Sequence, residues 1–159
     1  GASIFIDAGT TALYLAKEMP DISCNVFTNG LAVATELCKK KNVLVNLLGG
    51  PLIKDNLSTA SSFSSIYFAD TNFELAIISA ANSQLNDLTL ELTGLRFSLC
   101  ALDRLAMLVS ALMMLDSSKI GKIKPYTFAR AEDINVLITD EAFPEGLKES
   151  FKALNIVVM

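Results

Sequence analysis

The stretch Ile4-Phe5-Ile6-Asp7-Ala8-Gly9-Thr10-Thr11 decides the fold that we expect for this chain. Its apolar residues predict a short strand that ends on Asp7, and a turn at Gly9 leads into a helix over 12–19. A glycine there lets the backbone approach a ligand closely. The first N–H groups of a helix have no intrahelical partner, so they form an anion site together with the helix dipole. Ordinary helix capping by aspartate or threonine fits the same residues. The stretch alone therefore leaves phosphate binding and capping open.

Length and apolar content predict one domain built around buried parallel strands. The chain has 159 residues, of which 52% are hydrophobic, and its mean hydropathy is +0.45. Such a length supports a single sizeable core, and strands buried on both faces are read as continuous apolar runs. The longest apolar run, 105–115, is shorter than the ~20 residues needed to span a bilayer. We expect neither a membrane segment nor a signal peptide, since the chain starts directly in a strand.

Charge and cysteine content exclude several functions. The net charge is −4, and Lys39-Lys40-Lys41 is the densest basic cluster, so this part of the protein is not expected to bind DNA. Cys24, Cys38 and Cys100 lie far apart, which favours buried reduced thiols in a cytoplasmic protein. Without histidine, a zinc site and a Ser-His-Asp triad are excluded, and we expect no metal or cofactor.

The remaining chain alternates between predicted strands and helices. We expect strands over 26–29, 43–48, 75–80, 111–115, 134–140 and 156–159, and helices over 31–41, 61–69, 95–109 and from Pro144 to Leu154. Residues 52–60 are expected to form a loop, and 81–93 are polar without a clear assignment. This alternation predicts right-handed βαβ crossovers and an α/β fold, a Rossmann-like three-layer α-β-α structure with a mostly parallel sheet.

Small and polar residues collect where the predicted strands end. They are Asp7-Ala8-Gly9-Thr10-Thr11, Thr28-Asn29-Gly30, Gly49-Gly50, Asp116-Ser117-Ser118-Lys119 and Thr139-Asp140. In open parallel sheets, ligands bind beyond the carboxyl ends of the strands, so this pattern predicts a small-molecule pocket there. A dinucleotide site and a P-loop are not expected, because their glycine-rich motifs are missing. Lys119 fits either a phosphate contact or a solvated loop lysine, and Asp116 fits either a turn cap or a sugar contact.

Five motifs together resemble a known family. Residues 4–11, Phe27-Thr28-Asn29, Leu47-Leu48-Gly49-Gly50, Asp116-Ser117-Ser118-Lys119 and 134–140 occur in the order and spacing of the C-terminal sensor domain of DeoR-family transcriptional repressors. The resemblance implies a fold like that of ribose-5-phosphate isomerase A and the CoA-transferases. It also implies that residues 1–159 form a single domain that binds a phosphorylated sugar. Binding would alter operator affinity through a separate N-terminal winged helix-turn-helix, which this chain does not contain.

The same resemblance assigns roles to individual residues. Gly9, Thr10 and Thr11 are expected to hold the effector phosphate, and Lys119 is expected to make a charged contact. The residues expected around the sugar are Asp7, Thr28, Asn29, Gly49 and Gly50. We expect a homodimer or homotetramer, as is usual for regulators of palindromic operators. The sequence departs from the family at 79–89, where a glycine-rich turn is usual, and at 95–104, where only Asp103-Arg104 stands near the usual Lys-Arg pair.

Two other functions remain open from the sequence. An isomerase-type enzyme with this fold would need a carboxylate base, for which Glu74 and Asp70 are the candidates by position. An oligomerisation module without a working effector site is the other alternative, and the apolar segment 95–115 favours it.

Overall fold

The structure is a computed structural model that describes residues 1–59, 71–79, 82–86, 89–93, 110–120 and 127–159. Several sequence-based expectations fall outside these residues. They are the helices over 61–69 and 95–109, the candidate base Asp70, the thiol of Cys100 and the pair Asp103-Arg104.

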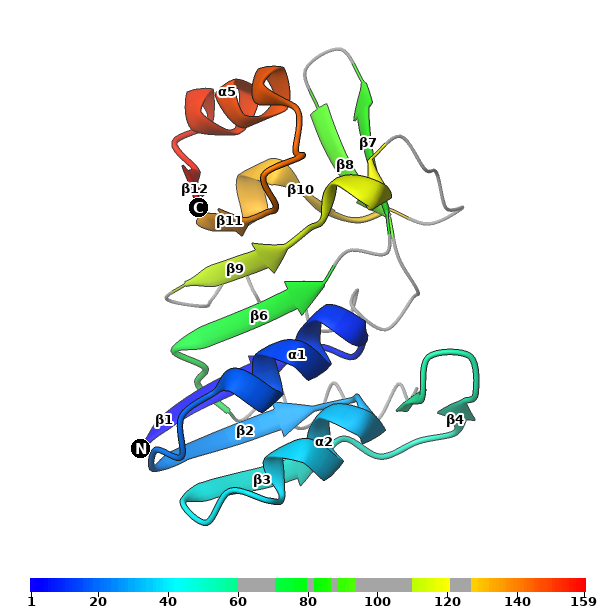
Figure 1. Cartoon of the computed structure of the whole chain (residues 1–159), viewed down its shortest axis with the longest axis vertical. Helices are drawn as coiled ribbons and strands as arrows, with labels where there is room; N and C mark the ends of the chain where they lie inside the picture. Colours follow the sequence, from blue (N-terminus) through cyan, green and yellow to red (C-terminus); the bar gives the residue numbers. More distant parts are fainter. Residues whose placement is uncertain (60–70, 80–81, 87–88, 94–109, 121–126) are drawn as a thin grey trace.

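The described residues form a parallel sheet of seven strands, in the order β12-β11-β9-β6-β1-β2-β3 (Figure 1). The strands are β1 (Ala2–Ile6), β2 (Cys24–Thr28), β3 (Val43–Leu47), β6 (Leu75–Ser79), β9 (Ala111–Met114), β11 (Val136–Ile138) and β12 (Val157–Val158). The chain proceeds outward from β1 to β3 and then starts again on the other side of β1 with β6. Such a reversal is a topological switch point, and ligands of open α/β sheets bind beside it.

Helices cover both faces of the sheet, which confirms the expected three-layer arrangement. α1 (Thr10–Glu18) and α2 (Leu31–Leu37) lie side by side on one face (Figure 1). Their buried residues pack with Ile6, Val26 and Ile77. The alternate strand residues Phe5 and Phe27 point to the other face, because successive side chains of a strand do so. That face also packs against Phe151 of α5 (Glu145–Ala153).

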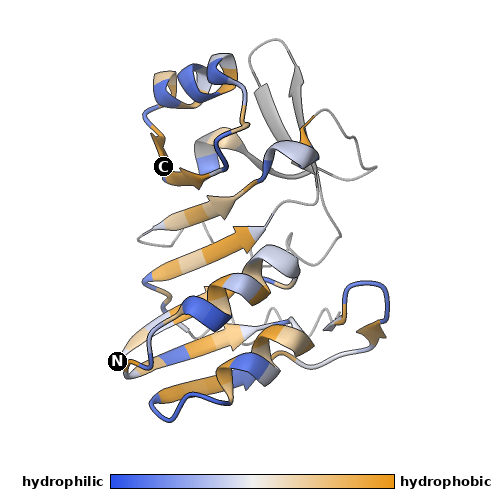
Figure 2. Cartoon of the chain, in the orientation of Figure 1, coloured by the Kyte–Doolittle hydropathy of each residue, from blue (hydrophilic) through white to orange (hydrophobic). Residues whose placement is uncertain are grey.

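The hydropathy of the elements agrees with this layering. Figure 2 shows hydrophobic residues concentrated along the strands, whereas α5 and the ends of α1 and α2 carry hydrophilic residues. α2 buries Val33, Ala34 and Leu37 against the sheet, whereas Leu31 at its start is exposed. Cys24 is buried, whereas Cys38 is exposed, so the expectation that all three thiols are buried is wrong.

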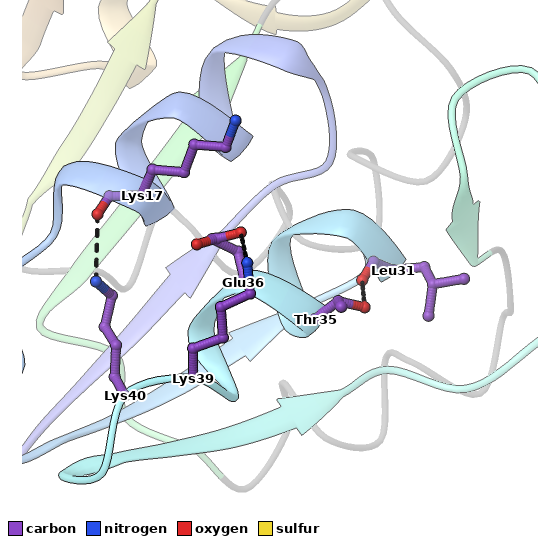
Figure 3. Close-up of polar contacts among 6 residues, drawn as sticks. All are labelled: Lys17, Leu31, Thr35, Glu36, Lys39 and Lys40. Carbon is purple, nitrogen blue, oxygen red and sulfur yellow. Dashed lines mark hydrogen bonds and ion pairs between the residues drawn. The ribbon is translucent and has the colours of Figure 1, made fainter.

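A polar contact links the last turn of α1 to the segment that follows α2 (Figure 3). The Lys40 ammonium donates to the backbone carbonyl of Lys17 at 3.3 Å, and Lys39 forms an ion pair with Glu36 at 2.7 Å. α2 ends at Leu37, four residues before the predicted end at Lys41. The Asp21 carboxylate accepts hydrogen bonds from the N–H of Lys41 at 3.1 Å and from the N–H of Asn42 at 2.8 Å. The chain therefore turns toward β3 instead of continuing as a helix.

Short antiparallel strands appear where no strand was predicted. β4 (Leu52–Ile53) and β5 (Ser58–Thr59) form a hairpin in place of the expected loop. β7 (Asn82–Asn86), β8 (Thr89–Thr93) and β10 (Thr127–Arg130) form a second small sheet. The pairing of β10 with β8 joins residues far apart in the chain, so local pattern does not predict it.

The C-terminal third follows the prediction with shorter elements. β11 covers 136–138 instead of 134–140, because residues 131–133 form a 3-10 turn whose Ala131 carbonyl accepts from Ile134 N–H at 3.1 Å. α5 is one residue shorter at each end than the predicted helix from Pro144 to Leu154, and Pro144 stands directly before it. The closing strand β12 pairs in parallel with β11.

Candidate functional site

The candidate site lies at the carboxyl ends of three neighbouring strands, β6, β1 and β2. Asp7 directly follows β1, Ser79 is the last residue of β6, and Asn29 directly follows β2. Asp7 and Ser79 lie at the switch point of the sheet, where β1 and β6 are neighbours. Asp7 and Asn29, which the sequence proposed as site residues, are therefore brought together by the sheet order.

Asp7 is a buried carboxyl group held by donors from the turn after β1 and from the end of β6. Its side chain accepts hydrogen bonds from Ala8 N–H at 2.8 Å and from the N–H and hydroxyl of Ser79, each at 3.4 Å. Burial raises the pKa of Asp7 from 3.8 to about 6, while hydrogen bonds from Ala8, Ser79 and Asn29 act in the opposite direction. The Asp7 carboxyl group is therefore ionised at neutral pH and becomes protonated when the pH falls below about 6.

Gly9 directly precedes α1 in a conformation that favours glycine. Its φ is 127°, and a Cβ at this position would stand 3.2 Å from the Ser79 hydroxyl oxygen. Among the described residues, no side chain caps the N-terminus of α1, and its first turn contains no acidic residue. The alternative that Asp7 or a threonine caps this helix is therefore wrong. Thr10 and Thr11 are exposed beside the uncapped amides.

The turn after β2 packs directly against the turn after β1. Thr28 is fully buried, and its hydroxyl oxygen accepts from Gly30 N–H at 3.0 Å, so this side chain stabilises the turn. A Cβ on Gly30 would stand 3.0 Å from the Cα of Ala8. Asn29 lies between these residues, and within the described part of the chain its buried Oδ1 atom has no hydrogen-bond partner.

The β4–β5 hairpin holds the backbone of Asn29 in place. Thr59 N–H donates to the Asn29 carbonyl at 2.7 Å, and the Thr59 hydroxyl donates to the carbonyls of Asn29 and Leu48. Gly49 and Gly50 follow β3, the neighbour of β2, and Gly50 has a φ of 136°. A Cβ on Gly49 would meet no atom within 4 Å. The two glycines thus lie at the same edge as Asn29, one strand further out.

Asp116 to Lys119 form a separate cluster at the ends of β9 and β11. The Asp116 carboxylate accepts from Ser118 N–H at 3.0 Å, so its role as a turn cap is confirmed. The Asp140 carboxylate accepts from the Ser117 N–H and hydroxyl, each at 3.0 Å, and these bonds lower the pKa of Asp140. Within the described residues, the half-buried Lys119 ammonium has no ion pair, and β6 separates β9 from β1.

Two residues of this edge, Ser79 and Thr59, were not among the sequence-based candidates. A small polar residue at the end of the fourth predicted strand was the only signal for Ser79. Gly30 was expected at this edge as one of the small residues that follow the second strand, but its close approach to Ala8 depends on the sheet order. Thr59 lies in a segment expected to be a loop, so no pattern connected it with Asn29.

One candidate base lies at the opposite end of the sheet. Glu74 N–H donates to the carbonyl of Ser3 at 3.0 Å, and the Glu74 carboxylate accepts from Ser3 N–H. Ser3 is near the start of β1, whereas Asp7 follows its end. Glu74 is therefore excluded as a base for a ligand at the carboxyl edge.

The described residues contain neither a metal-binding cluster nor a membrane-spanning helix. No group of three His, Cys, Asp or Glu residues there is placed to hold a metal ion. None of the helices in that part of the chain is both long and apolar enough to cross a bilayer.

Comparison with known proteins identifies relatives that regulate transcription. The chain is 30% identical over 93% of its length to an uncharacterised HTH-type transcriptional regulator, YulB of Bacillus subtilis. It is 29% identical over 98% of its length to the transcriptional repressor AccR of Agrobacterium fabrum, and 29% over 93% to an L-fucose operon activator of Haemophilus influenzae. The chain spans 57, 63 and 59% of these relatives, respectively.

One solved structure shares the fold at low identity. The beta subunit of eIF2B from Chaetomium thermophilum aligns over 86% of this chain and 43% of its own, with a TM-score of 0.52 and 12% identity. Ribose 5-phosphate isomerase A from Methanocaldococcus jannaschii aligns over 76% of this chain and 47% of its own, with a TM-score of 0.48 and 12% identity.

The model of the DeoR C-terminal sensor domain matches residues 1–141. The chain therefore belongs to the DeoR C-terminal sensor domain family.

Proposed function

We propose that this chain is the effector-binding domain of a cytoplasmic transcriptional regulator of sugar metabolism, and that its effector is a phosphorylated sugar. A separate DNA-binding domain would respond to the effector. Membership in the sensor-domain family supports this proposal, as do relatives named as transcriptional regulators, one of them an L-fucose operon activator.

The observation that carries the proposal is the uncapped start of α1 beside the buried Asp7 and the half-buried Asn29. The amides after Gly9 and the exposed hydroxyls of Thr10 and Thr11 offer donors to a phosphate. Asp7 and Asn29 stand next to this turn and offer acceptors to sugar hydroxyls. A ligand with an anionic end and a hydroxylated body suits both the donors at the start of α1 and the acceptors of Asp7 and Asn29.

Isothermal titration calorimetry with ribose 5-phosphate, fructose 6-phosphate and glucose 6-phosphate tests the proposal. The wild-type domain should bind at least one of them, and the double variant Thr10→Val, Thr11→Val should bind it at least tenfold more weakly. The variant removes two hydroxyl donors and leaves the apolar contacts of α1, so its fold should be retained.

Thr35→Val is the matched control, because Thr35 is an exposed helix threonine whose hydroxyl donates to the Leu31 carbonyl, away from the Gly9 turn (Figure 3). It should bind like the wild type. Unchanged affinity in the double variant would remove Thr10 and Thr11 from the phosphate site.

A sugar-phosphate isomerase is the second candidate, and the raised pKa of Asp7 favours it. A carboxylate whose pKa is close to the working pH suits a general base. A turnover assay with ribose 5-phosphate, run beside the calorimetry, separates the two functions. Binding without turnover supports the sensor. Turnover that Asp7→Asn abolishes would establish the enzyme instead.

We further propose that the protein acts as a homodimer or homotetramer, since two-fold operators are read by symmetric proteins. Sedimentation velocity of the domain at several concentrations tests this assembly. A monomer at every concentration would contradict self-association through this domain.

A further inference from the structure

Ser79 is a half-buried polar residue at the carboxyl edge of the sheet that has no part in the proposed function. It is the last residue of β6, a strand that pairs with β1 on one side and with β9 on the other. A group on such a strand is held more precisely than a group on a loop. Ser79 also begins the stretch 79–89, in which this sequence departs from the family.

The Ser79 hydroxyl reaches from β6 to the turn between β1 and α1. It donates to the Ala8 carbonyl at 2.8 Å, and its oxygen lies 3.4 Å from the Asp7 carboxylate. A serine hydroxyl has a single proton, so the bond to Ala8, which is much shorter, is the dominant one. The Ser79 hydroxyl therefore acts mainly on the backbone of the turn.

This bond sets the direction of the Gly9 N–H. A trans peptide is planar, and its C=O and N–H point to opposite sides. Because the Ala8 carbonyl is directed at Ser79, the Gly9 N–H of the same peptide is directed away from it. The first bond of α1 runs from Leu13 N–H to the Gly9 carbonyl at 2.9 Å, so the Gly9 N–H has no partner within the helix.

The packing of Ser79 against Gly9 keeps this arrangement tight. A Cβ at Gly9 would stand 3.2 Å from the Ser79 hydroxyl oxygen, and the φ of Gly9 is 127°. Glycine accepts this φ and this close approach because it has no side chain. Ser79, Ala8 and Gly9 thus form one contact across the switch point of the sheet.

We infer that Ser79 is a positioning residue for the effector phosphate: its hydroxyl holds the Ala8–Gly9 peptide so that the Gly9 N–H faces the anion at the start of α1. This inference rests on the proposed function. Ser79 acts through the backbone, because its single proton is already bound to Ala8. Without the hydroxyl the peptide is less restrained, and ordering it on binding costs affinity.

Ser79→Ala tests this role, because it removes the hydroxyl and keeps the backbone N–H. Calorimetry should show an affinity on the order of tenfold lower for the sugar phosphate that the wild type binds best. The affinity for inorganic phosphate, followed by amide proton–nitrogen correlation spectra, should fall by a similar factor, since the effect is on the phosphate end. Ser79→Thr keeps a hydroxyl in a residue that strands favour, so it should restore binding of both probes.

The amide signal of Gly9 is a readout that a general loss of stability does not change. Inorganic phosphate should shift this signal in the wild type, because the Gly9 N–H donates to the anion. In Ser79→Ala the signal should start from a different position without phosphate, and it should shift less at the same phosphate concentration. Ser79→Thr should return the signal towards its wild-type position.

Ser150→Ala is the matched control. The Ser150 hydroxyl also donates to a backbone carbonyl, that of Gly146 at 3.0 Å, but it lies on the exposed surface of α5. Its removal should leave the affinity for both probes and the Gly9 signal unchanged.

The outcomes separate the inference from the proposed function. If the wild type binds a sugar phosphate and Ser79→Ala binds it equally well, the inference fails and the function stands. The inference also fails if phosphate leaves the Gly9 signal of the wild type unshifted, or if Ser79→Thr binds as weakly as Ser79→Ala. If the wild type binds neither a sugar phosphate nor inorganic phosphate, both fail.

Discussion

At the scale of single residues, Asp7 differs most from an ordinary surface aspartate. It is only 9% exposed, and its carboxyl group is hydrogen-bonded to Ala8 and Ser79. Burial nevertheless dominates, because its pKa is raised to about 6. A group whose pKa is higher in the folded than in the unfolded state destabilises the fold once the pH exceeds the folded pKa. Ionised Asp7 therefore lowers the stability of the fold, which suits a residue that has a role in binding.

Asp7→Asn should stabilise the domain above pH 6. The contribution of Asp7 is fully favourable below its unfolded pKa of 3.8 and is lost as the pH rises through about 6. The difference corresponds to about 3 kcal/mol in the free energy of unfolding. In urea unfolding, the free energy of unfolding should decrease less from pH 5 to pH 8 for Asp7→Asn than for the wild type.

Asp140→Asn is the matched control, because hydrogen bonds from Ser117 lower the pKa of Asp140. Its carboxylate contributes stability above the unfolded pKa, so this substitution should destabilise the domain at pH 8. Equal pH profiles for the wild type and Asp7→Asn would contradict the burial argument.

At the scale of elements, the two strand-to-helix turns after β1 and β2 act as one packed unit. A Cβ on Gly30 would stand 3.0 Å from Ala8 Cα and 3.2 Å from Ala8 Cβ. The β4–β5 hairpin adds Thr59 to the same unit through its bonds to Asn29. The position of the Asn29 side chain relative to Asp7 therefore depends on Gly30, because a residue with a side chain would not fit so close to Ala8.

Gly30→Ala should destabilise the domain by about 1–3 kcal/mol, the usual cost of overpacking. The added methyl group meets backbone atoms of Ala8, which cannot rotate away. The same variant should weaken sugar-phosphate binding, because it separates the turn that carries Asn29 from the turn that carries Asp7. Chemical denaturation and calorimetry measure the two effects.

Gly49→Ala provides the control at the same edge of the sheet. A Cβ there would meet no atom within 4 Å, so the unfolding free energy should change by less than about 0.5 kcal/mol. If Gly30→Ala were as stable as Gly49→Ala, the two turns would not be in the close contact that we describe.

At the scale of the whole molecule, two layers of buried side chains hold the sheet from opposite faces. α1 and α2 cover the face of Ile6 and Val26, and α5 contributes Phe151 to the face of Phe5 and Phe27. Phe143 and Phe151 also pack against each other, with ring centroids 6.3 Å apart. The surface ion pairs of α5, such as Lys152 with Glu149 at 2.8 Å, are exposed and contribute little.

Phe151→Ala should therefore destabilise the domain by about 3–5 kcal/mol, the range for deleting a buried aromatic ring. Phe151 is 1% exposed and lies far along the chain from the candidate site. Denaturant midpoints measure the loss of stability. The folded fraction should bind the sugar phosphate with normal affinity, since the ends of β1 and β2 keep their contacts. Glu149→Ala on the exposed side of α5 should change the unfolding free energy by less than about 1 kcal/mol.

The sequence alone determined the alternation of strands and helices, the three-layer class and the edge at which polar residues gather. These features are local: an apolar strand ending at Asp7, a glycine turn and a helix are written in consecutive residues. Family membership also followed from such motifs, each carried by a few neighbouring residues.

Only the tertiary structure decided which of those residues meet. The pairing of β1 with both β2 and β6 sets Asp7 beside Ser79 and Asn29, and the β4–β5 hairpin adds Thr59. It also placed Glu74 at the opposite edge and left Gly9 as an uncapped helix start beside Asp7. Strand neighbours depend on long-range pairing and on burial of both faces of the sheet, and no local pattern encodes either. The opening strand, turn and helix thus follow from the sequence, whereas the unpaired oxygen of Asn29 beside them follows from the fold.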